Sequence, residues 1–126
     1  MDDRAARDYL LNQPDAWQDY PFGPDVAVFK IYKKMFATLG YEDQVARINL
    51  KCDPEEALAL RDIFPAVIPG YHMNKAHWNT VILDGSIPRG EIERMIDRSY
   101  ALVVKGLPQA QRVALEVRHG KRAIYR

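Results

Sequence analysis

The chain has 126 residues, of which 48% are hydrophobic and 28% charged, a balance typical of one globular domain spanning residues 1–126. Its 18 Lys and Arg residues against 17 Asp and Glu residues give a net charge of +1, which excludes a strongly basic or acidic protein. No apolar run approaches the ~20 residues of a membrane helix, and the polar segment Met1–Arg4 is not typical of a signal peptide. The single cysteine, Cys52, permits no internal disulfide, so we expect a cytoplasmic protein.

The first half of the chain predicts one helix and three strands. Small and apolar residues at helical spacing place a helix at Asp2–Leu11. The Pro and Gly residues of Trp17–Asp25 indicate an irregular connection. Alternating apolar residues then predict strands at Val26–Tyr32, Met35–Leu39 and Val45–Cys52. The turn between the first two falls near Tyr32–Lys33, which lacks the Gly or Asn that tight hairpin turns favour.

The second half predicts two long helices, a shorter one and two strands. Asp53 is placed to cap a helix with Pro54 at its first position and Glu56 in capping-box spacing, and Pro65 ends that helix. Tyr71–Asn74 and His77–Asp84 look like a strand pair around Asn74–Lys75, Glu91–Lys105 like a long amphipathic helix, and Gln109–Arg118 like a short one.

Up to Pro108, the order of these elements is one helix, three strands, one helix, two strands and one helix. Short connections between successive strands favour hairpins over crossover units. We therefore predict an α+β fold of two layers, an antiparallel five-stranded sheet with helices on one face. Alternating βαβ units are not indicated, which argues against a doubly wound nucleotide-binding fold.

The net charge is unevenly distributed along the chain. Residues 1–104 contain 12 Lys and Arg against 16 Asp and Glu, whereas residues 105–126 contain six against one. We interpret residues 109–126 as a basic C-terminal extension of the domain. A basic end can meet phosphate, and a solvated terminal helix is the simpler explanation of the same charges.

Seven segments carry a resemblance to a known family. They are Tyr20–Pro24, Val28–Lys30, Lys34–Ala37, Asn49–Pro54, Pro69–Lys75, His77–Thr80 and Ser99–Val104. In this set, which spans about residues 20 to 108, the chain resembles the MmcQ/YjbR family of small bacterial proteins. The resemblance implies a secretion-chaperone-like or frataxin-like outline and DNA binding through two wing-like loops. The chain departs from the family pattern at Tyr32–Lys33, where the family often has a Gly-containing turn.

A DNA-binding hypothesis follows from the two predicted hairpin tips. Lys33 and Lys34 lie at the first tip and Lys75 at the second, beside aromatic residues. Lysines suit phosphate contacts, and aromatic rings suit stacking on bases. The contact candidates are Lys34, Lys51, Lys75, His77 and Asn79, with Tyr71 and Trp78 as shape or stacking residues. A core position for Trp78 is the competing interpretation.

Two other functions use the same part of the chain. The Pro69–Asn79 loop could instead form the wall of a pocket for a small ligand or a protein partner. Catalysis would need Cys52 with His72 or His77 as a nucleophile and base, but Cys52 falls on the inward side of its strand. With one cysteine and no recognised zinc spacing, we expect a non-enzymatic protein without a metal or other cofactor.

Overall fold

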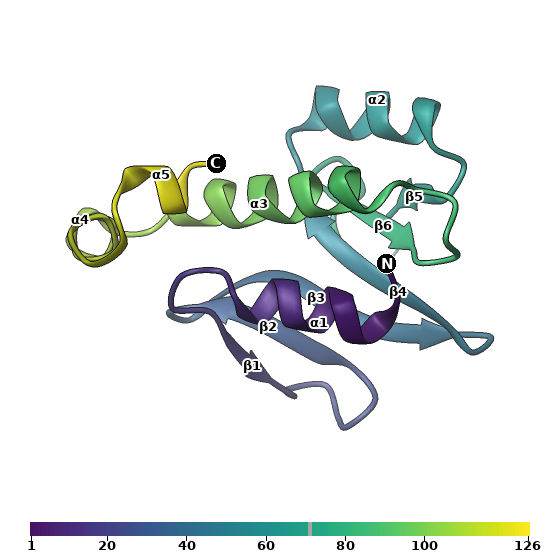
Figure 1. The fold of residues 1–126 in the computed structure, drawn as a ribbon, viewed down its shortest axis with the longest axis horizontal. Helices are drawn as coiled ribbons and strands as arrows, with labels where there is room; N and C mark the ends of the chain where they lie inside the picture. Colours follow the sequence, from purple (N-terminus) through teal and green to yellow (C-terminus); the bar gives the residue numbers. More distant parts are fainter. Residues whose placement is uncertain (71) are drawn as a thin grey trace.

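The computed structural model describes residues 1–70 and 72–126, and it contains one six-stranded sheet with helices packed against it (Figure 1). The strands are β1 (Trp17–Asp19), β2 (Ala27–Ile31), β3 (Lys34–Glu42), β4 (Val45–Lys51), β5 (Val67–Pro69) and β6 (Trp78–Ile82). The helices are α1 (Asp3–Leu11), α2 (Pro54–Ile63), α3 (Arg89–Lys105), α4 (Gln109–His119) and α5 (Lys121–Ile124). The strand order is β1-β2-β3-β4-β6-β5, and all neighbouring pairs are antiparallel. None of the helices in the described part of the chain is long and apolar enough to cross a membrane.

The predicted α+β fold with an antiparallel sheet is confirmed, but the sheet has six strands instead of five. β1 forms inside the segment expected to be irregular, where Trp17 pairs with Lys30 and Asp19 with Val28. The predicted strand at Tyr71–Asn74 is also wrong for residues 72–74, which form a loop, while Tyr71 lies outside the described residues. Its place beside β6 is taken by β5, whose Pro69 is tolerated because β5 is an edge strand.

The helix boundaries follow local signals that the sequence carries. Asp53 caps α2 as predicted, since its Oδ2 atom accepts hydrogen bonds from the backbone N–H groups of Glu55 (3.2 Å) and Glu56 (3.4 Å). Asp2 caps α1 in the same way, accepting from Ala5 N at 2.8 Å. Residues 109–126 form α4 and the unexpected short helix α5, which packs back on α3.

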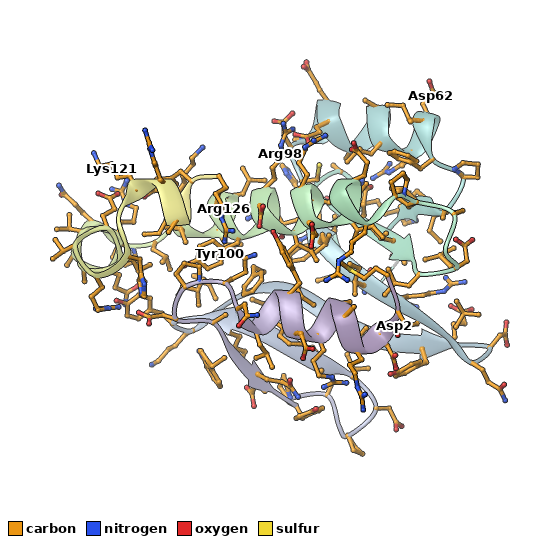
Figure 2. The ribbon with its side chains drawn as sticks, in the orientation of Figure 1. Asp2, Asp62, Arg98, Tyr100, Lys121 and Arg126 are labelled. Atoms are coloured by element: carbon orange, nitrogen blue, oxygen red, sulfur yellow. The ribbon has the colours of Figure 1, made fainter. Side chains whose placement is uncertain are left out.

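One face of the sheet is covered by helices. α3 contacts β2, β3 and β4, α1 contacts β3, and α2 contacts β5. The buried core combines side chains of these helices with strand residues of one alternation, including Phe29, Leu39, Ile48, Leu50 and Val81. In Figure 2 the labelled Tyr100 lies between α3 and the sheet region beneath it.

A bulge in β3 ties α3 to this covered face. Phe29 pairs with Ala37 and Lys30 with Met35, so Phe36 is left without a cross-strand partner. The Phe36 carbonyl instead accepts a 2.6 Å hydrogen bond from the Ser99 hydroxyl of α3, and its ring packs edge-on against Tyr100, with ring centroids 5.4 Å apart. The extra residue therefore directs a second aromatic side chain into the core.

The β2–β3 hairpin turns at Tyr32–Lys33 without glycine. Tyr32 adopts a φ of +52°, in the left-handed region. Its carbonyl accepts a 2.7 Å hydrogen bond from the Trp17 indole, and its hydroxyl lies 3.3 Å from Arg118 Nη2 of α4. Contacts with distant parts of the chain thus hold a turn that local propensity disfavours.

Candidate ligand-binding face of the sheet

The face of the sheet opposite the helices, here called the open face, carries a row of aromatic and basic side chains. Cross-strand pairs align Trp17 with Lys30, Lys30 with Met35, and Lys51 with Trp78. Residues directly opposite in a sheet share a face, and each neighbouring strand lies about 4.8 Å away. We name Trp17, Lys30, Met35, Lys51 and Trp78 the tryptophan–lysine row.

At the β1 end of the row, Trp17 and Lys30 contact each other directly. The Lys30 ammonium lies 5.1 Å from the centre of the Trp17 ring and 2.7 Å from Asp19 Oδ2. This hydrogen bond from Lys30 is the main reason that the pKa of Asp19 is lowered. Trp17 keeps 43% of its surface exposed, so its ring remains available for stacking.

Three further lysines lie at this end of the sheet without an acidic partner. Lys33 and Lys34 are exposed at the β2–β3 turn, and Lys51 is half-buried at the end of β4. Among residues 1–70 and 72–126, none of the three forms an ion pair. Two acidic side chains that follow β4 are engaged elsewhere, Asp53 as the α2 cap and Glu56 with Arg98.

The loop between β5 and β6 carries two more of the predicted contact residues. Lys75 and His77 are both exposed there, and His77 lies directly before β6, with its carbonyl accepting a 2.7 Å hydrogen bond from Cys52 N. Arg61 of α2 fixes the loop by donating hydrogen bonds to the carbonyls of Lys75 and Trp78. The loop base also requires a glycine, because a Cβ on Gly70 would meet Trp78 Cβ at 3.0 Å.

Asn79 does not lie on the open face. It is 2% exposed, and its Oδ1 atom accepts a 2.7 Å hydrogen bond from Arg61 Nε while its Nδ2 atom faces the Ala57 carbonyl at 3.4 Å. The alternation of β6 explains the position, since Asn79 pairs with Leu50, whose side chain belongs to the core. Its buried amide therefore joins β6 to α2 and is not accessible to a base.

The structure brings together some of the predicted site residues and separates others. Lys51 and Trp78 lie opposite each other in register, whereas Lys34 pairs with Ile31 and leaves the hairpin on the side of the covered face. The other stacking candidate, Tyr71, lies outside the described residues. Sequence reasoning missed Trp17 and Lys30 as site residues. The three residues of β1 are too few to show the alternation of a strand, so Trp17 was not placed in the sheet. For Lys30, the β-rich composition around it was the only signal in the sequence.

A second row on the open face is polar and hydrogen-bonded across three strands. Thr80 Oγ1 donates to Asn49 Oδ1 at 2.5 Å, and Asn49 Nδ2 donates to Thr38 Oγ1 at 2.8 Å. We call Thr38, Asn49 and Thr80 the hydroxyl–amide row. It lines a surface cavity of about 280 Å³ together with Arg47 and with Ile68 and His72, which flank the base of the β5–β6 loop.

The Cys52 thiol lies in an environment that favours its protonated form. The thiol is 8% exposed, and burial, followed by the charges of Glu56 and Asp53, raises its pKa to about 11. A thiol with such a pKa stays protonated at neutral pH and is a poor nucleophile. Within the described residues, no group of three His, Cys, Asp or Glu side chains is placed to hold a metal ion.

Known proteins share both the sequence and the fold of this chain. A sequence model of the YjbR family matches residues 11–102. The uncharacterised protein YbdF of Escherichia coli O157:H7 is 43% identical over 92% of this chain and 93% of its own length, and the uncharacterised protein YjbR of Escherichia coli K12 is 36% identical over 85% and 91%.

Solved structures agree with this relationship. The crystal structure of Deinococcus radiodurans protein DR2400, with a DUF419 domain, superposes with a TM-score of 0.82 at 36% identity and covers 90% of this chain and 87% of that one. A Pseudomonas syringae protein gives a TM-score of 0.71 at 35% identity, covering 81% of this chain and 98% of the other. The family match over most of the chain and these relatives show that the protein belongs to the YjbR family.

Proposed function

We propose that this protein binds nucleic acid, in the first place single-stranded DNA, along the tryptophan–lysine row of the open face. The observation that carries the proposal is that two tryptophan–lysine pairs, Trp17 with Lys30 and Trp78 with Lys51, lie on the same face of one sheet. Sequence-tolerant binding of single strands combines aromatic platforms with cations that follow the backbone. A single strand is favoured over a duplex because stacking on Trp17 and Trp78 needs unpaired bases.

The size of the row suits a short extended strand. Four steps between strands separate Trp17 on β1 from Trp78 on β6, which corresponds to roughly 19 Å at the usual strand spacing. Lys51 lies beside Trp78, and Lys33 projects from the adjoining turn. Both ammonium groups lack acidic partners in the described residues, so phosphate binding requires no ion pair to break. His77 and Lys75, on the neighbouring loop, extend this surface.

The basic C-terminal extension offers a weaker alternative. Arg118 forms an ion pair with Asp15, Arg126 lies 3.9 Å from Asp97, and the Lys105 ammonium lies 6.0 Å from the centre of the Tyr125 ring. Arg118 and Arg126 are two of the five Lys and Arg residues of the extension, and Lys105 is the last residue of α3. Lys121 and Arg122 are exposed, but they belong to α5, which packs on α3 at the covered side (Figure 2).

A non-enzymatic role and a cytoplasmic location are parts of the same proposal. The protonated, buried thiol of Cys52 supports the first, because no other candidate nucleophile with a neighbouring base emerged from the sequence. A chain with a single buried thiol suits a reducing compartment.

The experiment measures affinity for a labelled oligonucleotide by fluorescence anisotropy at several salt concentrations. The test variant is Lys33→Gln with Lys51→Gln, and the matched control is Lys121→Gln with Arg122→Gln, which removes the same charge from α5. Losing two phosphate contacts should reduce the slope of log affinity against log salt by about 1.4 for a single strand. The control should keep the wild-type slope.

Two outcomes contradict the proposal. Wild-type protein that binds neither single-stranded nor duplex DNA at low salt would exclude the function. Equal losses of DNA affinity in the two double variants would show that binding depends on net charge alone and not on the open face. Lys34→Gln sharpens the result further, because Lys34 projects on the covered side and should change the slope less than Lys51→Gln does.

A further inference from the structure

The cavity beside the hydroxyl–amide row has the composition of a binding site in its own right. Its residues lie on the open face because Gly40 pairs with Arg47, Thr38 with Asn49, and Ile68 with Thr80. The volume of about 280 Å³ lies just below the usual range for ligand pockets, so only a small metabolite fits. The tryptophan–lysine row lies about two residues further along β4, so the two sites are neighbours on one surface.

The hydrogen bonds of the row have a direction that leaves a donor facing the cavity. Thr80 donates to Asn49, and Asn49 donates to Thr38, so the oxygen of Thr38 is used as an acceptor. The hydroxyl proton of Thr38 has no acceptor within residues 1–70 and 72–126. A hydroxyl group is both donor and acceptor, and its unused half here is the donor.

Arg47 supplies the positive charge of the cavity. Its Nη1 atom lies 3.1 Å from Glu42 Oε2, and its Nε atom is buried without a hydrogen-bond partner. Its Nη2 atom likewise has no partner among the described residues. A guanidinium group offers five donors in a planar fork, so most of its capacity is unused here.

The contact with Glu42 shows that the Arg47 guanidinium binds a carboxylate. The Glu42 side chain is 60% exposed and reaches Arg47 from the rim of the cavity. An exposed ion pair of this kind contributes little to stability, so a competing anion can replace it. A carboxylate matches the planar fork with two parallel hydrogen bonds, a geometry that a single Nη1 contact does not use.

We propose that this cavity binds a small organic carboxylate, whose carboxylate group displaces Glu42 and pairs with Arg47 while Thr38 donates a hydrogen bond. The apolar part of the ligand contacts Val26 and Ile68, which line the cavity together with His72. The proposal does not depend on nucleic-acid binding, because none of these residues belongs to the tryptophan–lysine row.

Gly40 lines the cavity without a side chain, so a larger residue at this position should fill it. It faces Arg47 across the β3–β4 pair, and a Cβ at this position would meet Val26 Cγ2 at 3.7 Å, an ordinary van der Waals contact. Its backbone is not in the positive-φ region, so a larger residue is compatible with the strand. Gly40→Leu should therefore fill the cavity while the fold is kept.

The test is isothermal titration calorimetry with succinate, using succinamide as the uncharged control of the same size and inorganic phosphate as the alternative anion. Wild-type protein should bind succinate and not succinamide. Arg47→Gln and Gly40→Leu should each weaken succinate binding at least roughly tenfold, as expected for the loss of a charge-assisted pair or of the space itself. Glu42→Gln should strengthen binding, because it removes the competing carboxylate.

Circular dichroism and thermal melting confirm that each variant is folded. Absence of succinate binding by folded wild-type protein at millimolar concentration would overturn the proposal, as would unchanged binding in both Arg47→Gln and Gly40→Leu. Binding of phosphate without succinate would overturn the carboxylate assignment. Anisotropy with the oligonucleotide separates the two sites, since Gly40→Leu should leave DNA affinity within about twofold, the additivity expected of independent sites.

Discussion

The covered and open faces of the sheet are built from the same strands but carry different kinds of side chain. On the covered face, Phe29, Ile48 and Val81 are fully buried beneath the helices. On the open face, the residues that alternate with them include Lys30, Asn49 and Thr80, which are joined by hydrogen bonds and ion pairs instead of apolar packing. One surface therefore supplies the apolar core, while the other carries polar and aromatic groups outside that core, including the buried Thr38 and Thr80.

This difference explains how a small domain keeps a surface for binding. A half-covered antiparallel sheet needs one apolar face only, and α1 and α3 supply that cover (Figure 1). Mutations on the covered face should therefore reduce stability, whereas mutations on the open face should reduce ligand binding.

The largest expected effect is a cavity on the covered face. Phe36→Ala removes a fully buried ring that contacts Tyr100, and we expect the free energy of unfolding to fall by ~3–5 kcal/mol. Trp78→Ala, on the open face, should cost less than half as much, because Trp78 is only half-buried. Urea unfolding of both variants checks the comparison, and equal losses would show that Trp78 is a core residue.

Arg61 joins α2 to Asn79 and to the β5–β6 loop, and its loss should have the next largest effect on stability. Arg61→Met leaves Asn79 Oδ1 buried without its charged donor and releases the β5–β6 loop, so we expect a loss of about 1–3 kcal/mol. Arg94→Met is the matched control, because within residues 1–70 and 72–126 the Arg94 side chain pairs with Glu91 alone, on the surface of α3. Its loss should cost under about 0.5 kcal/mol. Similar values for the two variants would mean that Arg61 does not fix the loop.

The position of Asn79 shows where sequence reasoning stops. The Asp53–Pro54 cap was predicted because its signals lie within four residues of each other, and the structure confirms it. Whether Asn79 faces outward depends on the register of β6 against β4, and the partner that fixes its amide, Arg61, lies 18 residues away. Short-range patterns locate elements, but they do not identify the face on which a polar residue of a central strand lies.

The same limit applies to Trp17 and Tyr32. β1 has three residues, and its place in the sheet depends on pairing with β2 across an irregular connection. The family resemblance is confirmed, since the sequence model of the family matches residues 11–102. The resemblance did not predict how the turn at Tyr32–Lys33 forms without glycine, since the groups that hold it belong to Trp17 and Arg118.

Cys52 provides a chemical test of the covered face. Burial and nearby acidic residues raise the pKa of its thiol from 9.0 to about 11, so the thiolate fraction at pH 8 should fall about a hundredfold relative to an unperturbed thiol. We expect slow reaction with a disulfide reagent in the folded protein and rapid reaction in urea. Equal rates would show that the C-terminal end of β4 is not protected.

The smallest effect concerns acid stability. Hydrogen bonds from Arg118 and His119 lower the pKa of Asp15. A carboxyl group with a lower pKa in the folded state stabilises the fold above its unfolded pKa, and this contribution disappears as the pH falls through the folded value. Asp15→Asn should therefore slightly flatten the decline of stability below pH 4, and an unchanged acid transition would mean that this exposed pair contributes nothing.

The central claim, that the open face is the binding face, can be measured with the protein's own tryptophans. The chain has two, Trp17 and Trp78, and both belong to the tryptophan–lysine row. Titration with a short single-stranded oligonucleotide at low salt should quench their emission in parallel with the anisotropy of the labelled strand, because stacking of bases on indole rings changes their fluorescence. Binding seen by anisotropy without any change in tryptophan emission would contradict the account and direct attention to another surface of the protein.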